Sequence, residues 1–469
     1  MQKSKLIALL KTFSSSELRE FQDFISSPFY NKNEELLPLY TYLKKQAPDF
    51  DDKRLERAVV YKRVFKKDLT NEKHYHYVVS FLLKLAEQYI GLKEYATQAA
   101  MPQCHIVAAY MKRDLEKHYH YALSQAESLL EKQPLRNADY HFQQYLLADV
   151  ANSQFLRQRV HKLDSKLQLA ADSFDTYYIS QKLKYIGEML DRQKSVSAKY
   201  SIQLLGELKT YLADRDFTAT PSINIYYHLL LTLTTPDSVT HFFNLKKLVE
   251  QHTHQLSDEE NKRLYSHLLN YTIQKIREGE NSFLEECLQL YKRGIATQML
   301  YENGILSHWT YKNMVKLGLR LEQFDWVEQF ILEYNTHLKD DLRQNALDFN
   351  LAEYYYYKRD LDNALTHLNR VEFTDVFYTL DAKTMLAKIF YETEAQDTLQ
   401  ALIASFKIYL KRNPFISKNA QAPYQNFLKL LTQLAKRDKH QKKELLDEIN
   451  NTKFLAERSW LSECTAALR

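Results

Sequence analysis

Apolar residues recur along most of this chain at intervals of three and four, with polar residues between them. Leu18, Phe21 and Ile25 follow this spacing, and residues 283–291 repeat it. Such spacing places the apolar side chains on one face of a helix. Alternating, β-branched segments are almost absent, and the nearest is residues 231–234. The pattern predicts an all-α fold in which helices of about 12 to 25 residues, joined by short connections, pack as antiparallel pairs.

Three helix starts are marked by a serine followed three residues later by a glutamate. This arrangement can form a capping box, in which each side chain bonds the backbone N–H of the other residue. The three pairs are Ser14 and Glu17, Ser257 and Glu260, and Ser282 and Glu285. Each one precedes an apolar run with helical spacing, so we expect a helix to begin at each.

One hexapeptide occurs twice. Glu-Lys-His-Tyr-His-Tyr fills residues 72–77 and again residues 116–121, 44 positions later, and each copy leads into an apolar helical run. A period near 40 residues is typical of arrays of helical pairs. The sequence therefore indicates internal repetition.

Residues 351–368 resemble a tetratricopeptide repeat. Leu351 and Ala352 are followed by an aromatic residue three positions on, then by an Arg-Asp-Leu-Asp turn, and then by Ala364 and Leu368 in the second helix. A weaker copy lies 37 residues earlier and another 35 residues later. The resemblance implies an α-solenoid of stacked helical pairs, in which small residues let helices approach closely. Of the four consecutive tyrosines in this repeat, Tyr355 stands at the packing position and is expected in the core.

The opening of the chain, from Lys5 to Asn33, resembles the start of an uncharacterised family of helical bacterial proteins, for which no activity is implied. We expect an N-terminal helical domain over residues 1–100, with a boundary near Met101-Pro102. The solenoid would then occupy residues 101–469.

The composition argues against an enzyme. Only seven glycines occur among 469 residues, and phosphate-binding loops and nucleophile elbows depend on glycine. No dinucleotide fingerprint, P-loop, GxSxG or paired-carboxylate motif is present. We therefore expect no catalytic residue and no cofactor.

Metal binding is also not expected. Histidines two residues apart, as in the repeated hexapeptide, point in different directions on a helix and cannot chelate one ion. The three cysteines are isolated and far apart, which is typical of reduced structural thiols.

Polar residues interrupt every apolar stretch before it reaches the roughly 20 residues of a membrane span, and no signal peptide is indicated. The expected location is the cytoplasm.

The resemblance also implies a binding surface, because the first helix of each pair lines the concave groove of a tetratricopeptide solenoid. The positions that match are Lys312, Lys316, Arg320, Glu353, Tyr356, Tyr357, Lys388 and Tyr391. They would form a mixed aromatic and basic channel for an acidic peptide or a peptide C-terminus, with the basic side chains on carboxylates and the rings on apolar groups. Glu353 departs from the family's carboxylate clamp. A solvated charged face without a ligand is the alternative interpretation.

A second candidate surface is basic. Residues 405–443 contain ten lysines and arginines and one acid, a net +9 that leaves −4 for the rest of a chain of formal net charge +5. Within this segment, Lys429, Lys436, Lys439 and Lys443 would form a face opposite an apolar stripe. Such a face can contact phosphate groups of nucleic acid or a ribosomal surface. It equally suits a polar helix that caps the solenoid.

These observations predict a non-catalytic scaffold that binds a peptide or protein partner in a solenoid groove. The alternative is a nucleic-acid- or ribosome-associated factor that uses the basic segment 405–443. Neither hypothesis involves a membrane.

Overall fold

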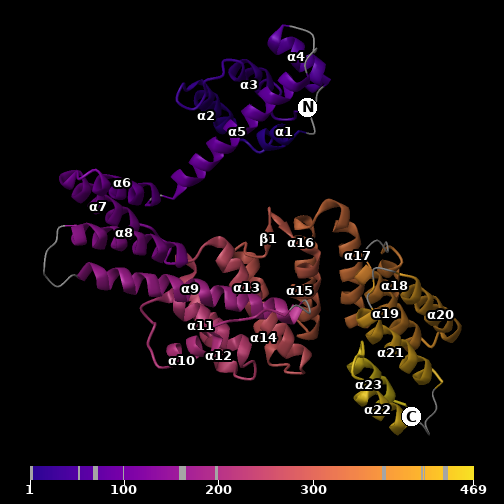
Figure 1. Ribbon diagram of the computed structural model, residues 1–469. Helices are drawn as coiled ribbons and strands as arrows, with labels where there is room; N and C mark the ends of the chain where they lie inside the picture. Colours follow the sequence, from indigo (N-terminus) through magenta and orange to yellow (C-terminus); the bar gives the residue numbers. More distant parts are fainter. Residues whose placement is uncertain are drawn as a thin grey trace. The chain divides into compact units, whose positions relative to one another are not determined.

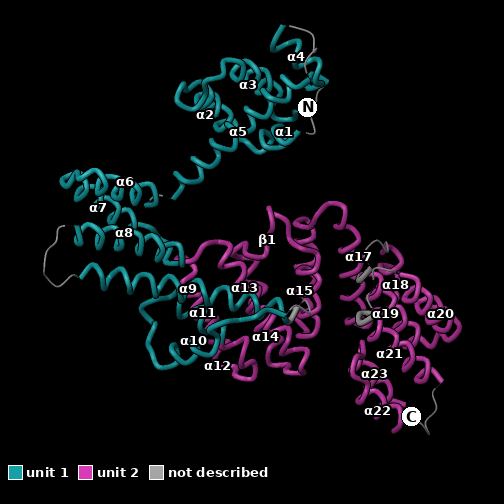
Figure 2. Tube along the Cα trace, in the orientation of Figure 1, with its two compact units in different colours: residues 1–230 teal, residues 231–469 magenta. Residues whose placement is uncertain are grey.

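The computed structural model describes residues 4–50, 53–66, 72–98, 100–157, 165–195, 199–371, 376–413, 416, 418–436 and 442–468. Most of these residues lie in α-helices, as predicted (Figure 1). The chain separates into two compact units, residues 1–230 and 231–469 (Figure 2). Among the described helices, none combines the length and the apolar composition that a membrane crossing requires.

The first helices of the first unit form a small bundle around one long helix, α5. α1, α2 and α3 all contact α5, and their shared core runs in sequence from Leu6 to Tyr89. A separate core joins α6, α7 and α8 from Ala100 onward. The helices are α1 (Lys5–Leu10), α2 (Ser15–Ser26), α3 (Leu36–Lys44), η1 (Lys53–Leu55), α4 (Arg57–Phe65), α5 (Glu72–Thr97), α6 (Met101–Lys112), α7 (Glu116–Glu131), α8 (Ala138–Arg157), α9 (Ser165–Ser195), α10 (Leu205–Ala213) and α11 (Pro221–Thr234).

The expected boundary near residue 101 falls between these two cores, whereas the division into compact units falls inside α11. The two copies of the repeated hexapeptide begin α5 and α7, as their apolar runs predicted. Residues 231–234, the nearest approach to a strand pattern, lie in α11.

The second unit contains the segments in which the sequence predicted repeated helical pairs. Its elements are α12 (Val239–His252), η2 (Thr253–Gln255), α13 (Asp258–Arg277), α14 (Phe283–Ala296), β1 (Tyr301–Glu302), β2 (Ile305–Leu306), α15 (His308–Arg320), α16 (Phe324–Tyr334), η3 (Asn335–His337), α17 (Asp340–Tyr357), α18 (Leu361–Leu368), α19 (Val376–Glu392), α20 (Gln396–Arg412), α21 (Lys418–Leu434), α22 (Lys442–Asn451) and α23 (Arg458–Ala466).

These helices stack as a solenoid. α15 packs on α16, α17 on α18 and α19 on α20, so each predicted repeat copy falls on one helical pair. The first helices of successive pairs also contact each other, α15 with α17 and α17 with α19. The second helices present their small and apolar residues to the core, where Val327 and Ala364 are fully buried. Neighbouring pairs therefore bury a continuous core, which is what stabilises a helical repeat array.

Gly318 permits the close approach of α15 and α16. A Cβ atom at this position would lie 2.5 Å from Val327 Cγ2 and 2.9 Å from Trp326 Cζ3. Gly318 lies 37 residues before Tyr355, at the position where the repeat pattern has an aromatic residue. The large ring at this interface comes instead from Trp326 on α16, the facing helix. The space between the two helices is therefore filled from α16 and not from α15.

Two of the three predicted capping boxes are present. In α2 and α13 the serine side chain accepts from the N3 backbone N–H, and the glutamate bonds back to the serine N–H. At the third pair the helix begins directly after Ser282, as predicted, but the capping box is absent, because Ser282 has helical backbone angles and its side chain makes no cap hydrogen bond. An N-cap needs an extended backbone at the serine, which the turn before α14 does not provide.

The tyrosine run of α17 differs from expectation. Tyr354 is the fully buried ring, at 1% exposure, whereas Tyr355 is only half-buried and stacks on His367 at a centroid distance of 5.5 Å. The Tyr354 hydroxyl donates to Glu328 Oε2 of α16 at 2.8 Å. The core face of α17 is therefore rotated by one residue from the predicted one.

The hairpin of β1 and β2 was not predicted. Tyr301 pairs with Leu306 and Glu302 with Ile305. Between them, Asn303 and Gly304 have φ angles of +51° and +79°. Two successive positive φ angles define the tight turn that Asn-Gly favours, so this dipeptide was the available signal.

Candidate functional site

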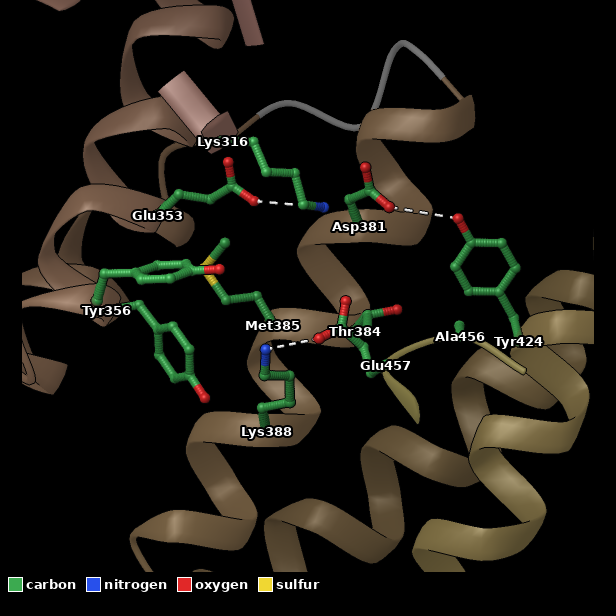
Figure 3. A pocket seen from close by; sticks show the side chains of 11 residues that line it. Lys316, Glu353, Tyr356, Asp381, Thr384, Met385, Lys388, Tyr424, Ala456 and Glu457 are labelled. Atoms are coloured by element: carbon green, nitrogen blue, oxygen red, sulfur yellow. Dashed lines mark hydrogen bonds and ion pairs between the residues drawn. The ribbon is translucent and has the colours of Figure 1, made fainter. Parts of the chain in front are cut away.

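The second unit contains a polar pocket beside the stacked helices α15, α17 and α19, with a volume of about 210 Å³ (Figure 3). These three helices contribute most of its wall. α21 and the segment just before α23 close the remaining side. The lining residues are Lys316, Glu353, Tyr356, Tyr357, Asp381, Thr384, Met385, Lys388, Tyr424, Ala456 and Glu457.

Four of the seven residues predicted to bind a partner line this pocket. They are Lys316 on α15, Tyr356 and Tyr357 at the end of α17, and Lys388 on α19. Glu353, which was placed in the same groove, lines it too. The packing of consecutive first helices brings these residues together, although 72 positions separate Lys316 from Lys388 in the sequence.

The other three predicted residues lie elsewhere. Lys312 is only 4% exposed, and Tyr391 is 9% exposed with its ring against Trp460. Arg320 is exposed at the end of α15, and its Nη2 donates to Asn281 Oδ1 at 3.2 Å. None of these three is among the residues that line the pocket.

Lys312 is buried among an acidic side chain and three aromatic rings. Its ammonium forms an ion pair with Asp381 and lies 4.9 to 5.2 Å from three ring centroids, those of Trp309, Phe349 and Tyr378. Rings from α15, α17 and α19 thus surround one cation, an arrangement in which cation–π attraction and the ion pair act together. The residue joins three helices of the stack.

The charge of Asp381, in the wall of the pocket, is consequently compensated by Lys312. Besides Lys312, it accepts a hydrogen bond from the Tyr424 hydroxyl at 3.3 Å, to Oδ1. Burial favours the neutral acid, but the charges of Lys312 and Lys316 outweigh burial and lower the pKa of Asp381. The carboxylate therefore stays ionised and compensates Lys312.

Lys316 and Glu353 face each other across a wider gap. The Lys316 Nζ lies 3.9 Å from Glu353 Oε1, within reach of an ion pair but beyond a hydrogen bond. Within the part of the chain that the structure describes, the buried Oε2 of Glu353 has no hydrogen-bond partner. Burial raises the pKa of Glu353 against the opposing effect of Lys316.

The Lys316 side chain is 42% exposed, and among the described residues its Nζ makes no hydrogen bond. Burial works against its charge, but Glu353, Asp381 and Glu457 together outweigh burial and raise the pKa of the ammonium. Lys316 is therefore a charged donor whose hydrogen bonds are not taken by the described protein groups.

Lys388 is paired. Its Nζ lies 2.8 Å from Glu457 Oε2 and 4.7 Å from the centroid of the Tyr356 ring. Beside this pair, Glu392 accepts hydrogen bonds from the Tyr356 hydroxyl and from Trp460 Nε1. The network connects α17, α19 and α23.

Three further lining residues were not predicted from the sequence. They are Asp381 on α19, Tyr424 on α21 and Glu457 in the segment before α23. A signal existed only for α19, where Asp381, Thr384 and Lys388 recur at intervals of three and four. This spacing puts polar groups on one helix face. Nothing local connects residue 457 with residue 388.

The basic segment is divided among several structural roles. Lys429 pairs with Glu448 at 2.7 Å, and Lys442 donates to the backbone carbonyl groups of Ala466 and Leu468 at the end of α23. Lys436 and Lys443 are exposed. Lys439 lies outside the described residues.

The described residues contain no group of three His, Cys, Asp or Glu side chains that could hold a metal ion. Burial raises the pKa of each cysteine, Cys104, Cys287 and Cys464, to about 11. Thiols with such pKa values are poor nucleophiles at neutral pH, because only the thiolate reacts.

Comparisons with protein-family models, with curated proteins and with solved structures find no match for this chain.

Proposed function

We propose that the second unit is a non-catalytic, tetratricopeptide-like interaction module that binds a short segment of a partner protein in the pocket. One observation carries this proposal: Lys316 presents a charged ammonium to the pocket, and none of its hydrogen bonds is taken by a described protein group. A carboxylate of the partner, from an acidic side chain or a chain terminus, would accept them. Charge-assisted hydrogen bonds of this kind are the strongest that a short peptide can form.

The charge balance of the pocket supports an anionic group. Lys312 compensates Asp381, and Glu457 compensates Lys388. Glu353 remains to compensate Lys316, but its Oε1 lies 3.9 Å from the Lys316 Nζ, beyond a hydrogen bond. The hydrogen bonds of this ammonium are therefore available to an anionic group of a ligand.

The walls supply the apolar contacts that a peptide needs. Tyr356, Tyr357 and Met385 line the pocket together with the charged groups. Ring and thioether surfaces of this kind pack against the aliphatic part of a bound side chain. The cavity volume of about 210 Å³ suits one inserted side chain or chain end and not a long buried segment.

We also propose a cytoplasmic location, because the three cysteines are unpaired and free thiols are the rule in reducing compartments.

The test is affinity purification of the tagged full-length chain from its own host, with nuclease and at near-physiological salt, followed by mass spectrometry. Lys316→Glu reverses the charge in the pocket, and Lys407→Glu makes the same change at an exposed position of α20. We expect a discrete set of proteins whose yield falls about tenfold or more in Lys316→Glu and is unchanged in Lys407→Glu.

Lys316→Gln, which removes the charge without adding a repulsive one, should give an intermediate loss. Matching far-ultraviolet circular dichroism and melting temperatures would show that the variants are folded. Equal yields from the wild type and Lys316→Glu would contradict the proposal.

The alternative function is binding to nucleic acid or a ribosomal surface through the basic segment. Lys407, Lys411 and Arg412 favour it, since all three are exposed on α20. Against it, Lys429 and Lys442 of the same segment are engaged within the protein. Captured material that disappears with nuclease, and that falls steeply between low and moderate salt, would support this alternative, and Lys407→Glu would then reduce the yield while Lys316→Glu would not.

A further inference from the structure

One side of the pocket is closed by residues 452–457, which we call the C-terminal strap. The strap joins α22 to α23, and Ala456 and Glu457 line the pocket (Figure 3). Its backbone is held by two hydrogen bonds to α21, from Asn426 Nδ2 to the Phe454 carbonyl oxygen at 2.7 Å and from the Ala456 N–H to the Pro423 carbonyl oxygen at 3.2 Å. Glu457 adds the ion pair with Lys388. At the start of the strap, Thr452 is hydrogen-bonded to Glu448 of α22, and its carbonyl oxygen accepts from Arg458 Nη2.

No side chain of the strap is fully buried. Leu455 and Ala456 are half-buried against the core, and Phe454, the largest side chain, is 58% exposed. Glu457 also has left-handed backbone angles, φ +53° and ψ +37°, which are unfavourable for a residue other than glycine. The ion pair therefore holds the strap against unfavourable local geometry.

α23 is anchored differently. Leu461 is fully buried, and Trp460 is 8% exposed among the rings of Tyr391 and Phe427. Local opening generally follows segments with few buried apolar contacts. The Glu457 carbonyl oxygen accepts from the Leu461 N–H at 3.0 Å, but the buried side chains belong to α23, so we expect the rest of the strap to open more readily than the helix.

We propose that the strap is an intramolecular ligand of the pocket, in which Glu457 occupies on Lys388 the position that an acidic side chain of the partner takes. This inference rests on the proposed function. When the strap lifts, Lys388 joins Lys316 as a second available ammonium. The partner segment therefore carries two carboxylates, one for each lysine, and must displace Glu457 to bind both.

The strap reduces the apparent affinity for any such segment, because only the open fraction of the protein is fully competent to bind. Weakening the ion pair should raise that fraction. The variant Glu457→Gln does so with little change in size, and Lys388→Gln breaks the same pair from the other side. Glu463→Gln is the matched control, since Glu463 is an exposed carboxylate on α23.

The first measurement is hydrogen exchange of the full-length chain, which needs no ligand. In Glu457→Gln and in Lys388→Gln, amides of residues 453–457 should exchange about fivefold faster than in the wild type. Those of residues 460–466 should keep their wild-type rates, and Glu463→Gln should change neither segment. Unchanged exchange of the strap would overturn the inference, and so would an equal acceleration in α23, which would mean that strap and helix open as one.

The second measurement is fluorescence polarisation with a fluorescein-labelled tetraglutamate peptide that has a free C-terminal carboxylate. Glu457→Gln should bind this probe about fivefold more tightly than the wild type does, and Glu463→Gln should bind it like the wild type. Adding Lys388→Gln to Glu457→Gln should remove the gain, because the freed ammonium is then absent.

The two proposals fail in different ways. Probe binding that is unaffected by Lys316→Glu would contradict the proposed function itself. Probe binding that is lost in Lys316→Glu but not improved in Glu457→Gln would leave the proposed function in place and overturn the role of the strap.

Discussion

Lys312 and Asp381 form a buried ion pair that joins α15 to α19, 69 positions apart in sequence, across the stack of first helices. Three aromatic rings surround the Lys312 ammonium, whose side chain is 6% exposed, whereas Asp381 lies at the pocket wall. This pair most directly compensates the charge that Asp381 brings to the pocket. One interaction therefore has two consequences, one for the stability of the stack and one for the charge that the pocket offers to a ligand.

Removing one partner of this pair should destabilise the second unit strongly. Asp381→Asn leaves the Lys312 ammonium buried without its counter-charge, and we expect a loss of about 3 kcal/mol in the free energy of unfolding. Urea denaturation followed by circular dichroism measures this loss. The double variant Lys312→Met with Asp381→Leu should be more stable than either single variant, because no unpaired charge remains. A wild-type midpoint in Asp381→Asn would contradict the structural role of the pair.

The buried carboxyl group of Glu353 should leave a signature in the pH dependence of stability. Its pKa is raised above the ordinary value of 4.5 by burial. Between the unfolded and the folded pKa the folded state binds more protons, so the stability falls as the pH rises through this window. Below the unfolded pKa the group contributes no dependence.

The comparison is between the wild type and Glu353→Gln over pH 4 to 8. The melting temperature of the wild type, relative to that of the variant, should decrease as the pH rises. Asp381 gives the opposite sign, because its pKa is lowered: its stabilisation is present above the unfolded value of 3.8 and is lost as the pH falls. A pH-independent difference between the wild type and Glu353→Gln would show that Glu353 titrates alike in both states.

Gly318 should not tolerate a methyl group. Gly318→Ala places a Cβ 2.5 Å from Val327 Cγ2, and the strain of overpacking should cost about 1 to 3 kcal/mol in the free energy of unfolding. Gly91→Ala is the control, because no atom lies within 4 Å of the added Cβ in the middle of α5. That change should stabilise the protein by about 0.5 to 1 kcal/mol through helix propensity. Thermal unfolding of both variants measures the two opposite shifts.

The two serines that precede α13 and α14 should differ in their contributions. Ser257→Ala removes the cap hydrogen bond to the Glu260 N–H and should cost about 1 kcal/mol in the free energy of unfolding. Ser282→Ala removes a side chain that makes no cap hydrogen bond, so its effect should stay within about 0.5 kcal/mol. Equal losses in the two variants, measured by denaturant titration, would contradict the difference between the two helix starts.

The capping boxes and the tyrosine run illustrate how far local patterns reach. The spacing of Ser14 from Glu17 predicted a helix start correctly, because both hydrogen bonds lie within four residues. At Ser282 the same spacing also predicted the helix start correctly, since α14 begins at Phe283, but the backbone angles of the serine leave the cap hydrogen bond unformed. In α17, Tyr354 and not Tyr355 is the core ring, and its hydroxyl donates to Glu328 of the facing helix. The spacing of residues within α17 does not specify which residues of α16 face it.

The amino-acid sequence by itself determined the helical character of this protein, since the periodicity of apolar residues and the helix-start signals act within a few residues of each other. It also placed Lys316, Tyr356, Tyr357 and Lys388 on the first helices of successive pairs. Only the tertiary structure decided which cations are available. Lys312 and Lys316 lie one turn apart on α15, yet rings from α17 and α19 bury the first, while the second lines a pocket. Likewise, Glu457 reaches Lys388 from 69 positions away. The physical reason is that burial and charge pairing depend on which distant helices pack together, and neither periodicity nor composition specifies that packing.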